Sequence, residues 1–222
     1  LTAAPVGQTA ATGGAMMKLD GRDVLLRSGE LLLNRENLKQ INVVIAPEAE
    51  EEVKRKLGGA LGFMGVKLTV GGRKWSEQIA AALAKINPES THVLVHDAAR
   101  PLVPQGDVDA ILEAAAKAAA VALTAPLRAS LVELDEGGGA LAVRAPGEFA
   151  QLLTPHVYSR QRFSELAAGR DIHPTEFTLV KGSSLNIRLA GAGDGGLAKA
   201  MLNLMPKPKS KAPSNPFEEA QW

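Results

Sequence analysis

The chain has 222 residues, of which 45% are hydrophobic and 22% charged, and a formal net charge of +1, the profile of one globular domain with a substantial core. Its basic residues are scattered and no apolar run is long enough to span a membrane, so we expect neither a nucleic-acid partner nor a membrane anchor. The absence of cysteine excludes disulfides and thiolate chemistry and is consistent with a cytoplasmic protein.

The first half of the chain alternates helix-like and strand-like segments from residue 22 to about residue 126. Before it, the chain opens on Leu1 without a secretory signal, and we expect a processed or truncated start. Apolar residues at helical spacing predict helices over residues 23–33, 47–57, 75–86 and 107–120. Short apolar runs predict strands over residues 41–46, 66–70 and 91–97. This alternation is typical of parallel βαβ units and predicts an α/β fold with a Rossmann-like, mostly parallel sheet.

The second half departs from this alternation. Residues 121–126, 130–134 and 140–144 read as strands, and the glycine-rich turn at 135–139 predicts a β-hairpin arm at about 128–145. A helix is expected in the second half of 155–169, strands over 177–180 and 185–189, and a closing helix over 196–204. From residue 206 the chain is rich in Pro, Lys, Ser and Asn, which predicts one domain over residues 1–205 and a disordered tail over 206–222.

One strand ends in a group of residues suited to ligand binding. Val93, Leu94 and Val95 form an apolar run that is followed at once by the sequence Asp97-Ala98-Ala99-Arg100-Pro101, which cannot continue a ladder. In open α/β sheets, ligands bind at the ends of such strands. The carboxylate suits a metal ion or a sugar hydroxyl, the small residues allow close approach, and the arginine carries a permanent charge. The alternative is an ordinary strand exit in which the acid and the arginine pair with each other.

The four histidines do not predict a metal site. His92 and His96 lie at strand spacing without paired carboxylates, and His156 and His173 stand apart from them in the sequence. We interpret all four as structural or loop histidines.

With these segments in place, the chain resembles the methylerythritol-phosphate cytidylyltransferases, members of the glycosyltransferase-A-like (nucleotide-diphospho-sugar transferase type) nucleotidyltransferases. The resemblance runs from about Leu1 to Pro206 and is carried most specifically by Val95-His96-Asp97-Ala98-Ala99-Arg100-Pro101. Supporting motifs include Leu19-Asp20-Gly21-Arg22, Gly71-Gly72, Thr124-Ala125-Pro126, Leu153-Thr154-Pro155, Val180-Lys181-Gly182 and Asn186-Ile187-Arg188.

The resemblance implies a reaction and a set of site residues. In this family a phosphomonoester of a sugar alcohol attacks the α-phosphate of CTP and pyrophosphate leaves, with Mg²⁺ as cofactor and a homodimer that pairs through the hairpin arm. Carried onto this chain, the catalytic cations are Arg188 and Lys18, and Asp97 is the metal ligand. The implied substrate-binding residues are Ala3, Ala4, Gly7, Gly71, Gly72, Asp97, Ala98, Arg100, Thr154, Lys181 and Gly182.

Several positions depart from the family pattern on the phosphate side. Pro5 replaces a glycine of the N-terminal loop, Thr9 stands at its arginine and Gly14 at its lysine. Trp75 stands at the arginine that follows the second glycine pair, and Gln78 at the nearby serine. The arginine of the hairpin return maps near Pro146, with Arg144 close by, and the family's Thr-Asp-Glu-Ala-Ser helix is shortened or missing between residues 169 and 177.

Three hypotheses follow. The chain is a working cytidylyltransferase in which Lys18, Arg73, Lys74 and Arg188 supply charge from shifted positions. Alternatively, it is a non-catalytic binding or scaffold protein on the same fold. A third possibility is transfer onto a different phosphorylated alcohol, because the acceptor side has changed most.

Overall fold

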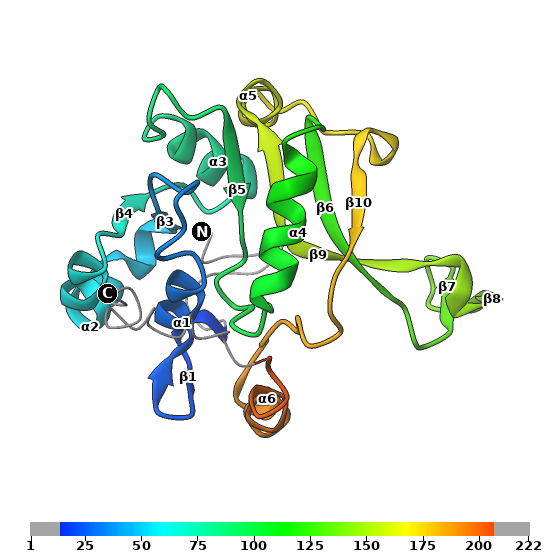
Figure 1. Cartoon of the computed structure of the whole chain (residues 1–222). Coiled ribbons are helices and arrows are strands. Elements are labelled where there is room, and N and C mark those ends of the chain that lie inside the picture. Colours follow the sequence, from blue (N-terminus) through cyan, green and yellow to red (C-terminus); the bar gives the residue numbers. More distant parts are fainter. Residues whose placement is uncertain (1–13, 207–222) are drawn as a thin grey trace, which may run out of the picture.

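The computed structural model describes residues 14–206, which form an α/β fold with a projecting hairpin (Figure 1). The helices are α1 (Val24–Glu30), α2 (Glu50–Phe63), α3 (Trp75–Leu83), α4 (Gln105–Ala115), α5 (Arg160–Ala167) and α6 (Gly195–Leu202). The strands are β1 (Lys18–Leu19), β2 (Arg22–Asp23), β3 (Asn42–Ile45), β4 (Lys67–Val70), β5 (His92–Val95), β6 (Ala120–Pro126), β7 (Leu131–Leu134), β8 (Ala140–Arg144), β9 (Ala150–Ser159) and β10 (Thr178–Lys181). The predicted α/β class is confirmed.

The largest sheet of the described chain has the strand order β10-β6-β9-β5. Strands β10 and β6 are parallel, whereas β9 runs antiparallel to both of its neighbours, so this sheet is mixed. Strands β3 and β4 form a separate parallel pair. Helix α4 lies across one face of β6 and β9, and Val108 and Ile111 of α4 are fully buried against them (Figure 1).

Three sequence predictions are corrected by the structure. Residues 185–189 form a loop rather than a strand, because their backbone bonds go to turns and to the loop after β5. Helix α4 ends at Ala115, and Ala120 already begins β6, because pairing of β6 with β9 and β10 overrides the helix propensity of the alanines. Residues 155–159 belong to β9, whose ten residues were not predicted as a strand.

The hairpin of β7 and β8 projects away from the body of the protein and pairs only with itself among the described residues (Figure 1). Its predicted position is confirmed. The predicted tail over 206–222 lies outside the described residues except for Pro206. Within residues 14–206, no helix is both long enough and apolar enough to cross a membrane.

Candidate functional site

The loop that follows β5 holds Asp97 just beyond the end of a strand, as the sequence predicted, although only Val95 of β5 is buried. Asp97 is only 6% exposed, and its backbone N–H donates to the hydroxyl of Thr154 at 3.1 Å. Its carboxylate Oδ1 accepts the N–H of Ala99 at 2.9 Å, which closes a tight turn. The second oxygen, Oδ2, accepts from Nε of Arg188 at 2.9 Å. The carboxylate is therefore fixed from both sides.

Two arginines flank this carboxylate. Arg188 makes the close ion pair, whereas Nε of Arg100 lies 4.0 Å from the same oxygen. Burial lowers the pKa of Arg100 and the charge of Asp97 opposes that shift, but a guanidinium stays protonated. One negative and two positive charges leave this group with a net charge of +1. Such an excess attracts an anionic ligand.

A bulge in β9 brings Thr154 to the site. Ala122 of β6 is opposite His156, but the next residue, Leu123, is opposite Leu153, so Thr154 and Pro155 are left out of the ladder. Pro155 has no N–H to donate, and bulges commonly redirect a side chain towards a functional site. The Thr154 hydroxyl consequently reaches the backbone of Asp97 from the neighbouring strand.

The loop that carries Arg188 is hydrogen-bonded both to Thr154 of β9 and to the loop that follows β5. The side-chain amide of Asn186 donates to the carbonyl of Thr154 at 2.7 Å, and the carbonyl of Asn186 accepts from Arg100 at 2.8 Å. One residue after Arg188, the N–H of Leu189 donates to the carbonyl of Ala99 at 2.9 Å. These bonds join three chain segments into one site.

Ala98 is fully buried at this site and its carbonyl accepts from the hydroxyl of Ser28 in α1 at 2.8 Å. Asp97, Ala98, Arg100, Thr154 and Arg188 thus lie together, as the resemblance implied. Lys18 is exposed on β1, and no hydrogen bond or ion pair within residues 14–206 joins it to this group.

The glycines Gly71 and Gly72 follow the end of β4 and have a packing role. A Cβ at Gly71 would lie 2.9 Å from a methyl of Val44, and one at Gly72 would overlap the side chain of Glu77. Gln78, buried beside them, donates to the carbonyl of Gly72 at 3.2 Å. Their part in substrate binding stays a prediction.

Lys181 is the last residue of β10 and Gly182 follows it; in the sheet, β6 lies between β10 and β9. The N–H of Gly182 donates to the carbonyl of Thr124 at 2.7 Å, and Ser183 N–H donates to the carboxylate of Asp107 at 2.7 Å. Burial raises the pKa of Asp107. The three remaining predicted residues, Ala3, Ala4 and Gly7, lie outside the described residues.

Two site residues were missed by the sequence analysis. His96 is fully buried and bridges the Thr154 hydroxyl and the Arg100 carbonyl, with distances of 3.2 Å from Nδ1 and 3.1 Å from Nε2. Burial lowers the pKa of His96 to about 3, which keeps the ring neutral. Asn186, the second missed residue, was noted only as part of a motif. The motifs that contain these two residues were the available signal, but Thr154, a hydrogen-bond partner of both, is distant from each of them in the sequence.

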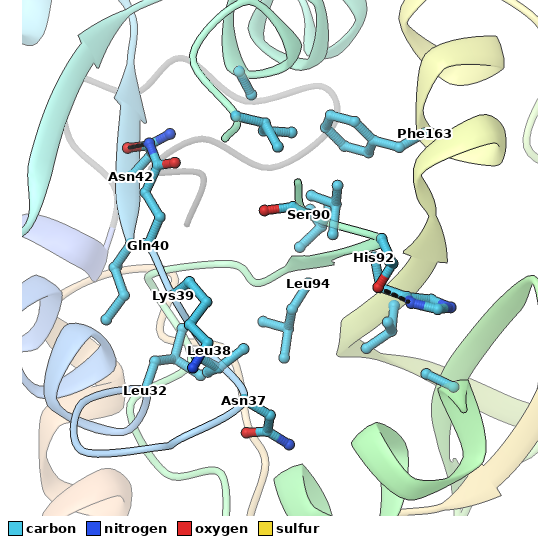
Figure 2. Close-up of a pocket in the computed structure, with 18 of the residues that line it drawn as sticks. Leu32, Asn37, Leu38, Lys39, Gln40, Asn42, Ser90, His92, Leu94 and Phe163 are labelled. Atoms are coloured by element: carbon cyan, nitrogen blue, oxygen red, sulfur yellow. Dashed lines mark hydrogen bonds between the residues drawn. The ribbon is translucent and has the colours of Figure 1, made fainter. Parts of the chain in front are cut away.

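A cavity of the described chain lies apart from this site. It has a volume of about 600 Å³ and is lined by β3, β5 and helix residues that include Val44, Ile79, Leu94 and Phe163 (Figure 2). Asp97, Arg100, Thr154 and Arg188 are not part of its lining.

The topology explains this cavity. In the described chain β3 pairs only with β4, and β5 only with β9, so that each has one open edge. Doubly wound sheets have the strand order 3-2-1-4, in which the first strand lies between the second and the fourth. The order β4-β3-cavity-β5 matches that arrangement. We assign no ligand to this cavity.

The described side chains of this site provide few ligands for a metal ion. Among residues 14–206, no three His, Asp or Glu side chains are grouped to hold one. In the described part of the chain, Asp97 is the carboxylate that pairs with the two arginines. Mg²⁺ commonly takes one or two carboxylates and fills its remaining positions with water and substrate phosphates, and this site fits an ion of that kind.

The sheet and the strand-end site define an α/β fold of the nucleotidyltransferase class. Two solved structures share this fold. A 4-diphosphocytidyl-2C-methyl-D-erythritol synthase from Anaerococcus prevotii has a TM-score of 0.72 at 19% identity, covering 87% of this chain and 93% of its own. A 2-C-methyl-D-erythritol 4-phosphate cytidylyltransferase from Thermus thermophilus has a TM-score of 0.69 at 23% identity, covering 86% and 94%.

The sequence comparisons narrow the class to one family. A family model described as IspD, 2-C-methyl-D-erythritol 4-phosphate cytidylyltransferase, matches residues 1–204. A protein of that name from Rhodopirellula baltica is 28% identical over 209 residues, which cover 83% of this chain and 85% of the relative. Another from Frankia casuarinae is 29% identical, covering 86% and 74%. The chain belongs to the IspD family, and the family resemblance predicted from its motifs is confirmed.

Proposed function

We propose that the chain is a 2-C-methyl-D-erythritol 4-phosphate cytidylyltransferase, an enzyme of isoprenoid precursor synthesis. It transfers CMP from CTP to the phosphate of the sugar alcohol and releases pyrophosphate. The observation that carries the proposal is the buried carboxylate of Asp97, which is held between Arg188 and the turn at Ala99 in the family's most specific motif. Family membership supplies the substrate class.

The reaction needs alignment and charge neutralisation rather than a protein nucleophile. An oxygen of the acceptor phosphate forms a bond to the α-phosphorus of CTP, and the bond from that phosphorus to the β-phosphate bridging oxygen breaks. Pyrophosphate leaves with the electron pair. Preorganised cations stabilise the charge that accumulates during such a transfer. Arg188 and Arg100, both fixed by hydrogen bonds, are suited to that role.

Magnesium fits this proposal as an ion that arrives with the triphosphate. Asp97 is the residue that would hold it, in place of part of its present pairing with Arg188. When bound, Mg²⁺ supplies charge neutralisation at the phosphates.

The shifted-cation hypothesis is supported unevenly. Arg188 lies at the site, but Arg73 is paired with Glu48 on the surface. Lys18 is exposed on β1, and Lys74 is exposed at the start of α3. We therefore assign the compensating charge to Arg188 and Arg100. The scaffold alternative is not favoured by the family match or by the names of the relatives.

The test is a turnover assay on the whole chain. CTP, 2-C-methyl-D-erythritol 4-phosphate and Mg²⁺ are supplied, and pyrophosphate release is followed beside a calorimetric titration with CTP. We expect saturable CTP binding and stoichiometric pyrophosphate. Tight CTP binding without turnover would favour the scaffold alternative, and turnover only with another phosphorylated alcohol would favour the third hypothesis.

For its partner we propose a second copy of the chain, bound through the hairpin arm. Leu131, Val132, Leu134, Leu141 and Val143 are all exposed on this isolated pair of strands. A two-stranded hairpin is marginally stable alone, and a contiguous exposed apolar patch marks a contact surface. A cytoplasmic location is consistent with the absence of cysteine.

A further inference from the structure

His96 is the one buried histidine that contacts the strand-end loop directly among the described residues. We propose that His96 is a positioning residue for the nucleotide: its neutral imidazole fixes the Thr154 hydroxyl and the Arg100 carbonyl, and so holds Asp97 and Arg100 in their binding geometry. This inference rests on the proposed function, because CTP is the ligand for which the geometry is held.

The hydrogen bonds allow one arrangement of protons. The Arg100 carbonyl can only accept, so Nε2 of His96 carries the proton and donates at 3.1 Å. In a neutral ring Nδ1 is then an acceptor, and the Thr154 hydroxyl donates to it at 3.2 Å. This leaves the Thr154 oxygen as the acceptor for the backbone N–H of Asp97 at 3.1 Å. Each donor in this series of hydrogen bonds has an acceptor, and a fully satisfied buried network of this kind is rigid.

The network acts on both charged groups of the loop. The Asp97 N–H begins this series of hydrogen bonds, and the Arg100 carbonyl ends it. The Arg100 N–H also donates to the Asp97 carbonyl at 3.0 Å. Asn186 adds a second tie, since it bonds to Thr154 and Arg100. His96 itself is fully buried, so it does not touch a ligand and acts only through these neighbours.

The test uses three variants of His96 that divide its two contacts. His96→Leu removes both. His96→Asn keeps an acceptor near the position of Nδ1, and His96→Gln keeps a donor near the position of Nε2. Loss of one net hydrogen bond corresponds to a roughly two- to tenfold change in affinity. We expect His96→Leu to raise the Kd for CTP about tenfold, and both amide variants to give intermediate values.

A matched control is offered by His156, a half-buried histidine whose Nδ1 bonds to the Tyr158 hydroxyl at 2.9 Å rather than to the loop. His156→Phe is expected to lower the melting temperature and leave the Kd for CTP unchanged. If His96→Leu lowers the melting temperature to the same degree and also leaves the Kd unchanged, His96 is merely structural and the proposal is overturned.

A double-mutant cycle with Thr154→Val separates this inference from the proposed function. Its readout is hydrogen exchange at the Asp97 amide, which needs no nucleotide. We expect His96→Leu and Thr154→Val each to accelerate exchange, and the double variant to exchange no faster than Thr154→Val. Additive effects would overturn the inference. Wild-type protein that fails to bind CTP would contradict the proposed function, while the exchange result still decides the role of His96.

Discussion

Replacing Arg188 with methionine removes the closest charge partner of Asp97 while keeping an unbranched side chain of similar reach. The two side chains are 18% and 9% exposed, so the pair is close to buried. Removing one partner of a fully buried pair costs about 3–5 kcal/mol. Asp97 keeps the Ala99 N–H and the more distant Arg100, so we expect a smaller loss of about 1–3 kcal/mol in the free energy of unfolding.

The effect on catalysis should exceed the effect on stability. Loss of one preorganised cation from a phosphoryl-transfer site lowers kcat about 10²- to 10³-fold. Arg188→Lys keeps the charge but loses the planar fork, and should fall between the wild type and Arg188→Met. Pyrophosphate release gives kcat and KM for CTP, and urea unfolding gives stability.

One result would refute this reasoning. If Arg188→Met unfolds at lower urea but keeps the wild-type kcat and KM, the ion pair is only structural and the site lies elsewhere. A matched surface variant, Arg73→Met, breaks the exposed pair with Glu48 and should leave both kinetic constants unchanged.

Three further predictions concern stability and assembly. Burial lowers the pKa of His96 to about 3 and the pKa of His156 to about 4, whereas both histidines titrate near 6.5 in the unfolded chain. Above pH 6.5 these two histidines are neutral in both states, so they do not lower the free energy of unfolding. Below that pH the unfolded chain binds more protons, and urea unfolding should lose several kcal/mol by pH 4.5; a flat profile from pH 7 to 5 would contradict this. Gly71→Ala should cost about 1–3 kcal/mol because its Cβ would lie 2.9 Å from a β3 methyl. Gly58→Ala, in the middle of α2 where a Cβ meets no other atom, should raise the free energy of unfolding by about 0.5–1 kcal/mol. Equal melting temperatures for the Gly71→Ala and Gly58→Ala variants would contradict both expectations. Val143→Lys on the hairpin should shift the chain towards monomer in sedimentation velocity, and an unchanged oligomer would place the contact elsewhere.

The local sequence was sufficient for the elements whose residues agree on one structure. The apolar run at 93–95 and its end at Asp97 predicted a strand with a polar tip, because Asp97 to Pro101 cannot extend a ladder. The predicted full burial of this strand was wrong, since only Val95 of β5 is buried. The glycines at 137–139 likewise predicted the hairpin between β7 and β8. The motif around Asp97, together with the supporting motifs along the chain, was also sufficient to identify the family.

Only the tertiary structure decided which side chains meet. Residues 150–159 carry no alternating pattern that predicts a strand, yet β9 forms because β5 and β6 both pair with it. The partner of Asp97 is Arg188, 91 positions along the chain, rather than the neighbouring Arg100. The sequence by itself determined where a carboxylate ends a strand. The folded chain determined its charge partners, because ion pairs and hydrogen bonds depend on distances that chain order does not encode.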